Sequence, residues 1–518
     1  MNRFDVLYDP WIPVVTVGGE SQTLGILPAL EQAHTLRDVL CESPLETYAV
    51  FRLLIAFLMD AYSPASVNDR VSIYRSGRFD PVVLSQYVSL CLTEEASFDL
   101  FDEKRPFMQA AFDPELDIGK EKSAANLFHA LPTGTYHVHF DHLLEDHRSF
   151  TPDECLRGLL SSYVFAYGAG SGYHASINGG PCCYVLLKGD SLFETLVLNM
   201  LSKAECRMGW DMPPIAWRNM RKQIPNEKFA STSVLNGLTW LPRRITLKAP
   251  CANHISRIYW QSGNYMDTEG SWIDPHVPYI VTEGNRVPLR SRPGRSAWRD
   301  LAAFGCISVH NSCLPAIIQN ASALNDKFEN GWTRLVVFGL SMDPQKSARK
   351  LDTVFEEIVV PYAILSCSDR VERLKSDIKY IEMVATHLEK IIFWFEHENT
   401  GLLNQAEPMR IKLPSDSEIE KRGRLCKEAK NLFFSEIYQF LRTKYFSSLS
   451  ETDVCSQHWD NSIIELATQS ANEIAWHIVN AYALRFGNSA RELQIQAAAI
   501  GKFHDLLNKS AKERLEVS

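Results

Sequence analysis

The strongest constraint in this 518-residue sequence is an apolar repeat that runs through its C-terminal part. From about Ser366 onward, apolar residues recur at three- or four-residue spacing, which places them on one face of a helix. Shorter stripes follow at 425–441, 463–482 and 493–507, separated by polar segments. The first and longest stripe comprises Val371, Leu374, Ile378, Ile381, Ala385, Leu388, Ile392 and Phe395. Four such helices joined by polar loops predict an antiparallel four-helix bundle.

Residues 1–360 show no such repeat. Short apolar runs at 181–187 and 245–247 predict strands. Amphipathic segments at 44–62 and 192–201 predict helices. Ser43 suits the N-terminal cap of the first of these helices. The sequence therefore predicts an α+β fold, in which a large irregular mixed domain at 1–360 precedes the four-helix bundle at 361–518.

The chain has an ordinary globular composition with a formal net charge of −9. A free-standing nucleic-acid binder is usually basic, so contact with DNA or RNA would need a local basic patch or the field of partner subunits. The N-terminus lacks the continuous apolar core of a signal peptide, and no run of eighteen apolar residues occurs. Twelve scattered cysteines without a CxxC pair indicate reduced thiols. We therefore expect a cytoplasmic protein without a membrane partner.

Glycines gather at Gly168-Ala169-Gly170-Ser171-Gly172 and again at Gly179-Gly180. Such clusters let the backbone approach a ligand closely and expose N–H groups to phosphate. The pattern is not a Walker loop, because no Gly-Lys-Ser/Thr follows. It is not a dinucleotide fingerprint either, because no acidic residue closes a βαβ unit. A plain flexible turn and a loop pressed against a nucleic-acid groove both remain open.

A run of arginines without an intervening acid covers residues 286–299: Arg286, Arg290, Arg292, Arg295 and Arg299. Such a patch can hold phosphates even on an acidic protein, and Arg290, Arg292 and Arg295 are candidate phosphate contacts. A solvated charged face is the alternative interpretation.

The segment His137-Val138-His139-Phe140-Asp141-His142 matches H-x-H-x-D-H, the metal-binding signature of metallo-β-lactamase-fold zinc hydrolases. That fold requires a buried strand before the motif and small residues after it. Here Leu131-Pro132-Thr133-Gly134-Thr135 precedes the motif and Leu143-Leu144-Glu145-Asp146 follows it. Short matches of this kind arise by chance in histidine-rich loops, so a polar loop is favoured and a zinc hydrolase is kept as the alternative.

Four motifs occur in a collinear order: Leu7–Val14 (LYDPWIPV), Arg105–Gln109 (RPFMQ), the glycine module at Gly179–Asn199, and Leu238–Arg244 (LTWLPRR). Together they resemble the CasA family, the large subunit of the type I-E CRISPR Cascade complex. The order and spacing hold from residue 1 to about 350, and the C-terminal helices fit that family's bundle.

The resemblance implies a DNA- and RNA-binding subunit that is not an enzyme and needs no cofactor. It would join crRNA and other Cascade subunits, and it would recognise the protospacer-adjacent motif in double-stranded target DNA. It would then start strand separation for R-loop formation and help recruit a helicase–nuclease effector. Specificity beyond the motif would come from RNA–DNA pairing.

The resemblance also assigns residues. Gly168 to Gly172 match the glycine loop that touches the motif from the minor groove. Asp343-Pro344-Gln345-Lys346 match the wedge inserted beneath the motif, with Gln345 at its tip. Asn126, Phe128 and His129 match the start of the loop that docks on the crRNA 5′ handle, where Phe128 is a candidate stacking residue.

Two departures from the family pattern concern metal and motif reading. Some members carry two cysteine pairs that could bind zinc, whereas only Cys155 and Cys251 remain in those regions here, so we predict no such zinc. Some members also reach the motif with a lysine from the loop that corresponds to Gly263–Glu269, which contains none. The motif preference, or the way the motif is read, is therefore expected to differ.

Overall fold

The chain divides into two compact units, Met1–Tyr362 and Ala363–Ser518. Mixed helices and strands in the first unit and long helices in the second confirm the predicted α+β class. The computed structural model describes residues 3–131, 148–168, 173–219, 221–229, 233–248, 251, 253–266, 272–282, 285–292, 294–305, 314–324, 331–342, 351–398, 415, 424–451, 457–486 and 501–512.

Unit 1 contains helices and strands mixed along the sequence. Its α-helices are α1 (Ile26–Glu31), α2 (Pro44–Tyr62), α3 (Val67–Ser76), α4 (Pro81–Thr93), α5 (Pro114–Asp117), α6 (Pro152–Val164), α7 (Leu192–Asn199), α8 (Val234–Leu238) and α9 (Ala316–Gln319). Its strands are β1 (Ile12–Thr16), β2 (Ser21–Leu24), β3 (Leu36–Val39), β4 (Glu121–Ser123), β5 (Tyr184–Lys188), β6 (Lys228–Phe229), β7 (Arg243–Leu247), β8 (Arg257–Ser262), β9 (Tyr265–Met266), β10 (Tyr279–Thr282), β11 (Asn285–Pro288), β12 (Trp332–Met342) and β13 (Leu351–Pro361).

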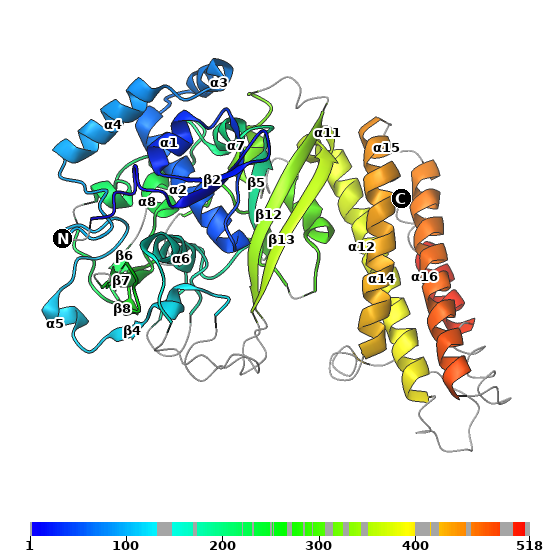
Figure 1. Cartoon of the computed structure of the whole chain (residues 1–518). Coiled ribbons are helices and arrows are strands. Elements are labelled where there is room, and N and C mark those ends of the chain that lie inside the picture. The colour runs from blue at the N-terminus through cyan, green and yellow to red at the C-terminus, as the bar shows by residue number, and fades with distance from the viewer. Residues whose placement is uncertain are drawn as a thin grey trace. The chain divides into compact units, whose positions relative to one another are not determined.

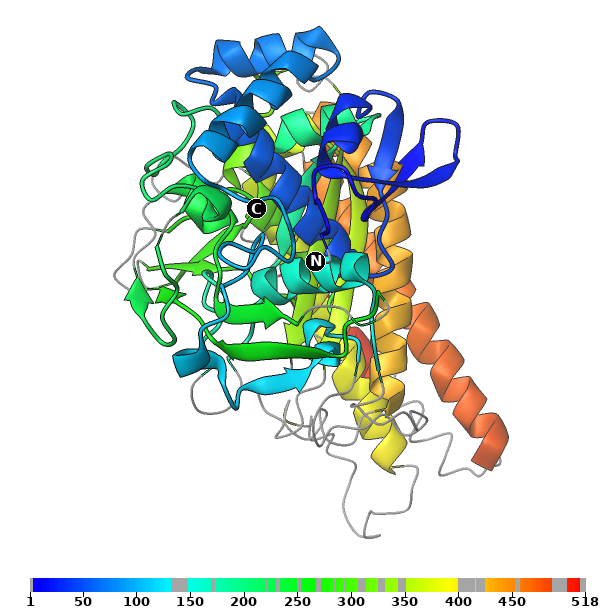
Figure 2. The same ribbon diagram turned by 60° about the vertical axis from the view of Figure 1, so that its left-hand side comes forward.

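The described strands form small separate sheets rather than one continuous layer (Figures 1 and 2). The longest ladder joins β12 and β13 in antiparallel register from Trp332↔Pro361 to Met342↔Leu351, and β5 pairs with the other edge of β12. A second sheet has the order β4-β8-β7, and a third has the order β2-β1-β3. Strands far apart in the sequence therefore meet in the first two of these sheets.

Helix α2 is the core element of unit 1. Its bounds are those that the sequence predicts, because Pro44 occupies the first turn and the Oγ of Ser43 accepts a hydrogen bond from the backbone N–H of Leu45, at 3.2 Å. Every residue from Leu45 to Asp60 is buried, and the helix packs against α4, α6, α7, α8 and β12. No single helix in the described ranges is long and apolar enough to cross a membrane, although α2 and α3 together satisfy length and composition across a bend of 110°.

A buried ion pair connects α2 to the β-rich part of unit 1. Nη1 of Arg52 lies 2.9 Å from Oδ2 of Asp274, and both side chains are almost fully buried. The same guanidinium donates to the carbonyl oxygens of Leu238 and Gly237, at 2.9 and 3.2 Å. Burial alone would raise the pKa of Asp274, but Arg52 and His276 hold that pKa well below its ordinary value.

Unit 2 consists of helices that follow the predicted stripes. They are α11 (Tyr362–Ser366), α12 (Ser368–Glu398), α14 (Arg424–Phe440), a wider helical turn at Leu441–Tyr445, α15 (Phe446–Glu451) and α16 (Gln457–Phe486). Helices α12, α14 and α16 pack against one another and alternate in direction (Figure 1).

The fourth predicted stripe is described only in part. Residues 501–512 are helical, and Ser510 lies 2.9 Å from the ring of His387 on α12, whereas 493–500 lie outside the described residues. The described residues of unit 2 thus contain three long helices and part of a fourth.

We predict that Arg52→Met lowers the free energy of unfolding by about 3–5 kcal/mol, because it leaves the Asp274 carboxylate buried without its partner. Urea denaturation followed by circular dichroism measures the change. The matched control is Arg3→Met, since Arg3 forms an ion pair with Asp5 while its side chain is 74% exposed. This control should change stability by less than about 0.5 kcal/mol. Equal effects of the two substitutions would contradict the prediction.

We also predict that part of the acid sensitivity of unit 1 comes from Asp274. Its pKa is lowered in the folded state, so the stabilisation is complete above the ordinary pKa of 3.8 and is lost as the pH falls from there towards the folded-state value. Asp274→Asn should therefore lose stability at neutral pH and show a flatter decline below about pH 4. Denaturation curves at a series of pH values measure this difference.

Candidate nucleic-acid interface

The two ends of the predicted glycine loop are held together by backbone and side-chain hydrogen bonds. The N–H of Ser176 donates to the carbonyl oxygen of Ala166 at 2.9 Å. The guanidinium of Arg243 donates to the carbonyl oxygen of Tyr167, at 2.8 Å, and to that of His174. Gly168 is described, and residues 169–172 lie outside the described residues. Arg243 thus bridges the two stems of the segment that contains the predicted loop.

Arg243 reaches these stems because it is the first residue of β7. Successive side chains of a strand point to opposite faces, so Arg243 and Arg244 contact different parts of unit 1. Arg244 pairs with the buried carboxylate of Asp117, at 2.7 Å, whereas Arg243 turns to the glycine stems. Burial lowers the pKa of Arg243 to about 10, so its guanidinium remains charged at neutral pH.

Half-exposed aromatic rings follow the glycine segment. Cationic groups of Lys122 and Arg243 lie over the ring of Tyr173, at 5.6 and 5.4 Å from its centroid. The ring of His174 stacks on Tyr265 of β9 with centroids 4.1 Å apart. Tyr265 belongs to the Gly263–Glu269 segment that the resemblance places near the DNA motif. Rings of this kind beside exposed cations can stack on bases while the cations hold phosphates.

The predicted crRNA-docking residues lie next to the glycine stem. Nδ2 of Asn126 donates to the carbonyl oxygen of Ser123, at 2.9 Å. The ring of Phe128 packs against Phe150 with centroids 4.5 Å apart and stays half-buried. The ring of His129 lies 6.2 Å from that of Tyr167.

The histidine of this group is neutral near pH 7. Burial, together with the nearby charge of Arg243, lowers the pKa of His129 to about 4. Its Nδ1 is buried without a partner among the described residues. A contact of His129 with RNA would therefore be a neutral hydrogen bond rather than a phosphate ion pair.

The three candidate phosphate-binding arginines have different surroundings. Arg290 donates a hydrogen bond to the carbonyl oxygen of Gly179, at 3.1 Å. The guanidinium of Arg290 also lies against Gly180, so close that a Cβ atom on Gly180 would come within 2.5 Å of it. Both glycines have positive φ, which suits a turn that wraps this guanidinium. Arg295 forms a two-point ion pair with Asp300, whereas Arg292 is exposed. Of the three, Arg292 best fits a phosphate contact.

The predicted wedge falls between β12 and β13. Met342 and Leu351 form the last described pair of that ladder, and Asp343, Pro344, Gln345 and Lys346 lie outside the described residues. On β12, the Oγ of Ser291 occupies the space where a Cβ on Gly339 would lie. The arginine segment therefore contacts β12 at Gly339, three residues before the end of that strand.

The histidine motif at 137–142 also lies outside the described residues. Within the described ranges, no group of three or more histidine, cysteine, aspartate or glutamate side chains is arranged to hold a metal ion. Cys155 is buried in α6, and burial raises the pKa of its thiol, while Cys251 is exposed.

The structure thus brings together several of the predicted segments. His129 meets Tyr167, the stem after the glycine segment meets Tyr265, and the arginine segment meets both Gly179-Gly180 and β12. No role was predicted from the sequence for Arg243, Lys122 or Tyr173. For Arg243, membership in the LTWLPRR motif was the sequence signal that could have indicated a role.

Residues 5–447 match the protein family described as CRISPR-associated protein Cse1. The chain belongs to the Cse1 family. The CasA/Cse1 protein of Thermus thermophilus is 27% identical over 407 residues, which cover 76% of this chain and 77% of that protein.

Solved Cse1 structures share the fold at low sequence identity. The Cse1 of Acidimicrobium ferrooxidans has a TM-score of 0.74 at 19% identity and covers 99% of both chains. The Cse1 of Thermobifida fusca has a TM-score of 0.75 at 18% identity and covers 98% of both. A chain of a solved CRISPR RNA-guided surveillance complex has a TM-score of 0.70 at 17% identity, covering 97% of this chain and 100% of that one.

We predict that Arg243→Met separates the stems of the glycine segment. Two hydrogen bonds from a charged donor are lost, so the amide of Ser176 should exchange with solvent at least about tenfold faster. Hydrogen exchange resolved at Ser176 measures this rate. Arg221→Met is the matched control, because Arg221 pairs with Glu227 and lies outside the stems. Unchanged Ser176 exchange in a folded Arg243→Met protein would show that the stems do not depend on this side chain.

Proposed function

We propose that this chain is the large subunit of a type I-E Cascade surveillance complex and acts by binding rather than by catalysis. Membership in the Cse1 family is the observation that carries the proposal. The similar chain in a solved CRISPR RNA-guided surveillance complex supports assembly with crRNA and other Cascade subunits. In this role the chain recognises the protospacer-adjacent motif in double-stranded DNA, initiates R-loop formation and helps to recruit a helicase–nuclease.

The proposed recognition of DNA combines a glycine-rich backbone segment, which fits a narrow groove, with a side chain that separates the two strands. Gly168 to Gly172 approach the motif in the minor groove, where hydrogen-bond readout is degenerate and little space is available. Gln345, at the tip of the segment Asp343–Lys346, enters beneath the motif and separates the first base pairs. Opening costs about 1.4 kcal/mol per base step, and pairing with the guide then makes the exchange nearly balanced. No nucleotide hydrolysis is needed for such an exchange.

The surroundings of the glycine stems support a nucleic-acid contact. Lys122 is exposed beside Tyr173, and the His174–Tyr265 stack is half-exposed next to it. Stacking of a base on an aromatic side chain contributes about 1–3 kcal/mol. In the same proposal, Asn126, Phe128 and His129 dock the crRNA handle, which would place RNA and DNA contacts on either side of Tyr167.

The wedge is tested on two substrates with the assembled complex. We predict that Gln345→Ala and Gly170→Asp each weaken binding to a motif-bearing duplex about tenfold, which corresponds to about one base step. Binding to a target whose strands are already separated should change less than about twofold, because no opening is required. Electrophoretic mobility shift at fixed salt measures both affinities. Gln86→Ala, at an exposed position of α4, is the matched control.

Equal loss on the duplex and on the pre-opened target would contradict the wedge assignment. Co-purification tests the wider proposal independently, since the wild-type chain should be recovered in a multi-subunit complex that contains crRNA. A chain that never associates with RNA-bearing subunits would overturn the assignment to Cascade.

A further inference from the structure

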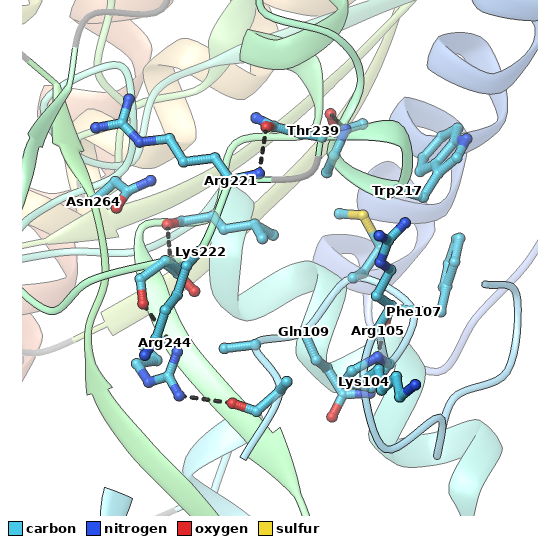
Figure 3. Close-up of a pocket in the computed structure, with 18 of the residues that line it drawn as sticks. Lys104, Arg105, Phe107, Gln109, Trp217, Arg221, Lys222, Thr239, Arg244 and Asn264 are labelled. Carbon is cyan, nitrogen blue, oxygen red and sulfur yellow. Dashed lines mark hydrogen bonds between the residues drawn. The ribbon is translucent and has the colours of Figure 1, made fainter. Parts of the chain in front are cut away.

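Unit 1 contains a cavity of about 450 Å³ that the proposed DNA and RNA contacts do not use (Figure 3). Two of the family motifs line it, Arg105–Gln109 from one side and the segment Asn236–Arg244 from the other. A third wall comes from the segment Ala216–Gln223. The volume falls within the range of small-ligand sites, which is about 300–1,000 Å³.

The walls of the cavity are fixed by internal contacts. Arg244 donates to the carbonyl oxygens of Ala111 and Gln223, at 2.7 and 2.9 Å, so it joins two walls (Figure 3). Trp217 stacks on Phe107 with ring centroids 5.6 Å apart. The cavity is therefore preformed, and a ligand would meet little cost of ordering its walls.

Several residues that line the cavity carry buried polar atoms without partners among the described residues. Nε2 of Gln223 donates to two carbonyl oxygens, so its Oε1 is the atom left over. Nδ2 of Asn236 donates to the carbonyl oxygen of Pro214, and its Oδ1 is likewise left without a hydrogen-bond partner. Gln223 is 8% exposed and Asn236 is 6% exposed. Each unsatisfied buried group costs about 1–3 kcal/mol, a cost that a hydrogen-bond donor would remove.

Two further lining residues extend this set. Oδ1 of Asn264 and Nε1 of Trp240 are also buried without a partner in the described part of the chain. Trp240 is 7% exposed, and its ring lies nearly parallel to that of Phe229, with centroids 5.7 Å apart. Gln223, Asn236, Trp240 and Asn264, called the inner wall below, thus carry three acceptors and one donor without partners among the described residues, beside flat aromatic surface.

The outer rim has the opposite electrostatic character. Three exposed cationic side chains line the cavity, Lys104 on one side and Arg221 and Lys222 on the other, and they are called the rim below (Figure 3). Lys222 pairs with Asp113 and Arg221 with Glu227, each at 2.6 Å, and Arg221 also lies over the ring of Phe229, 4.2 Å from its centroid. Lys104 has no acidic partner among the described residues, so it is the rim cation best placed to meet an anion. A ligand that fits both ends has hydrogen-bond donors on a flat head and an anionic tail.

We propose that this cavity binds one nucleotide of a single-stranded nucleic acid, with the base inside and the phosphate at the rim. Adenine, cytosine and guanine present an exocyclic amino donor to the acceptors of the inner wall. Uracil and thymine present an oxygen where cytosine has its amino group and keep only the ring N3–H as a donor, so they satisfy fewer of those acceptors. The site therefore prefers amino-bearing bases. RNA and DNA supply the same head and tail, so the experiment compares both.

Binding is measured with the purified full-length chain, which keeps the test independent of duplex reading by the glycine segment. Fluorescein-labelled tetranucleotides rA₄, rC₄, rU₄ and their DNA counterparts are titrated at fixed salt and followed by fluorescence anisotropy. We expect saturable binding of the A and C forms, at least about fivefold tighter than the U or T forms. Unlabelled AMP and CMP should compete better than UMP. A preference for the ribose or deoxyribose series identifies the natural source.

Two substitutions locate the bound nucleotide. Asn264→Ala should reduce the difference between A or C and U, because one of the three acceptors of the inner wall is lost. Lys104→Ala should weaken all of the oligonucleotides about threefold to tenfold and leave the base preference intact. Lys120→Ala, at an exposed lysine that does not line the cavity, is the matched control and should change neither property.

Three outcomes would overturn the proposal. The first is the absence of saturable binding by the folded chain at millimolar mononucleotide. The second is equal affinity for amino-bearing bases and uracil. The third is an equal loss in the Lys104→Ala and Lys120→Ala proteins, which would indicate diffuse attraction to the surface rather than a site.

Discussion

The buried ion pair between Arg52 and Asp274 is the contact on which the arrangement of unit 1 depends. It fixes helix α2 to two segments that continue into the functional regions. The carbonyl oxygens of Gly237 and Leu238 lead directly into β7, and Asn178, which donates to Asp274 at 3.0 Å, follows the glycine stems. Separating these segments would leave a charge inside the core, which is far more costly than the loss of apolar contact alone. The pair therefore restricts how far the stems and β7 can move apart.

Several arginines of unit 1 form such internal contacts instead of adding positive charge to the surface, which is consistent with an acidic chain whose proposed nucleic-acid binding uses few exposed cations. Arg70 pairs with Glu205, Arg244 with Asp117 and Arg295 with Asp300. Few cations remain exposed beside the candidate interface, with Lys122 and Arg292 as the clearest cases. A phosphate backbone held mainly by partner subunits needs only a few local contacts of this kind from the chain itself.

Local sequence signals predicted the helices well, whereas contacts between residues far apart in the sequence could not be predicted. Ser43 and the largely apolar run after it define α2, and the three- or four-residue spacing defines α12, because both signals act over neighbouring turns. The pairing of β5 with β12 could not be foreseen, since the two strands are far apart in the sequence. Arg243 was noted only as part of a motif, because the carbonyl oxygens that it binds lie 69 and 76 residues away. Asp300, by contrast, stands beside the arginine run and could have indicated that Arg295 is paired. The glycine loop and the wedge remain predictions.

The register of β7 on β8 sets Arg243 opposite Ser262 and Arg244 opposite Gln261. Because neighbouring side chains leave a strand on opposite sides, a slip of one residue would exchange the two guanidinium groups. Asp117 would lose its counter-charge, and the carbonyl oxygens of Tyr167 and His174 would lose their shared donor at the same time. Insertions or deletions within β7 or β8 should therefore be rare in functional relatives, even where the loops that connect the strands vary in length.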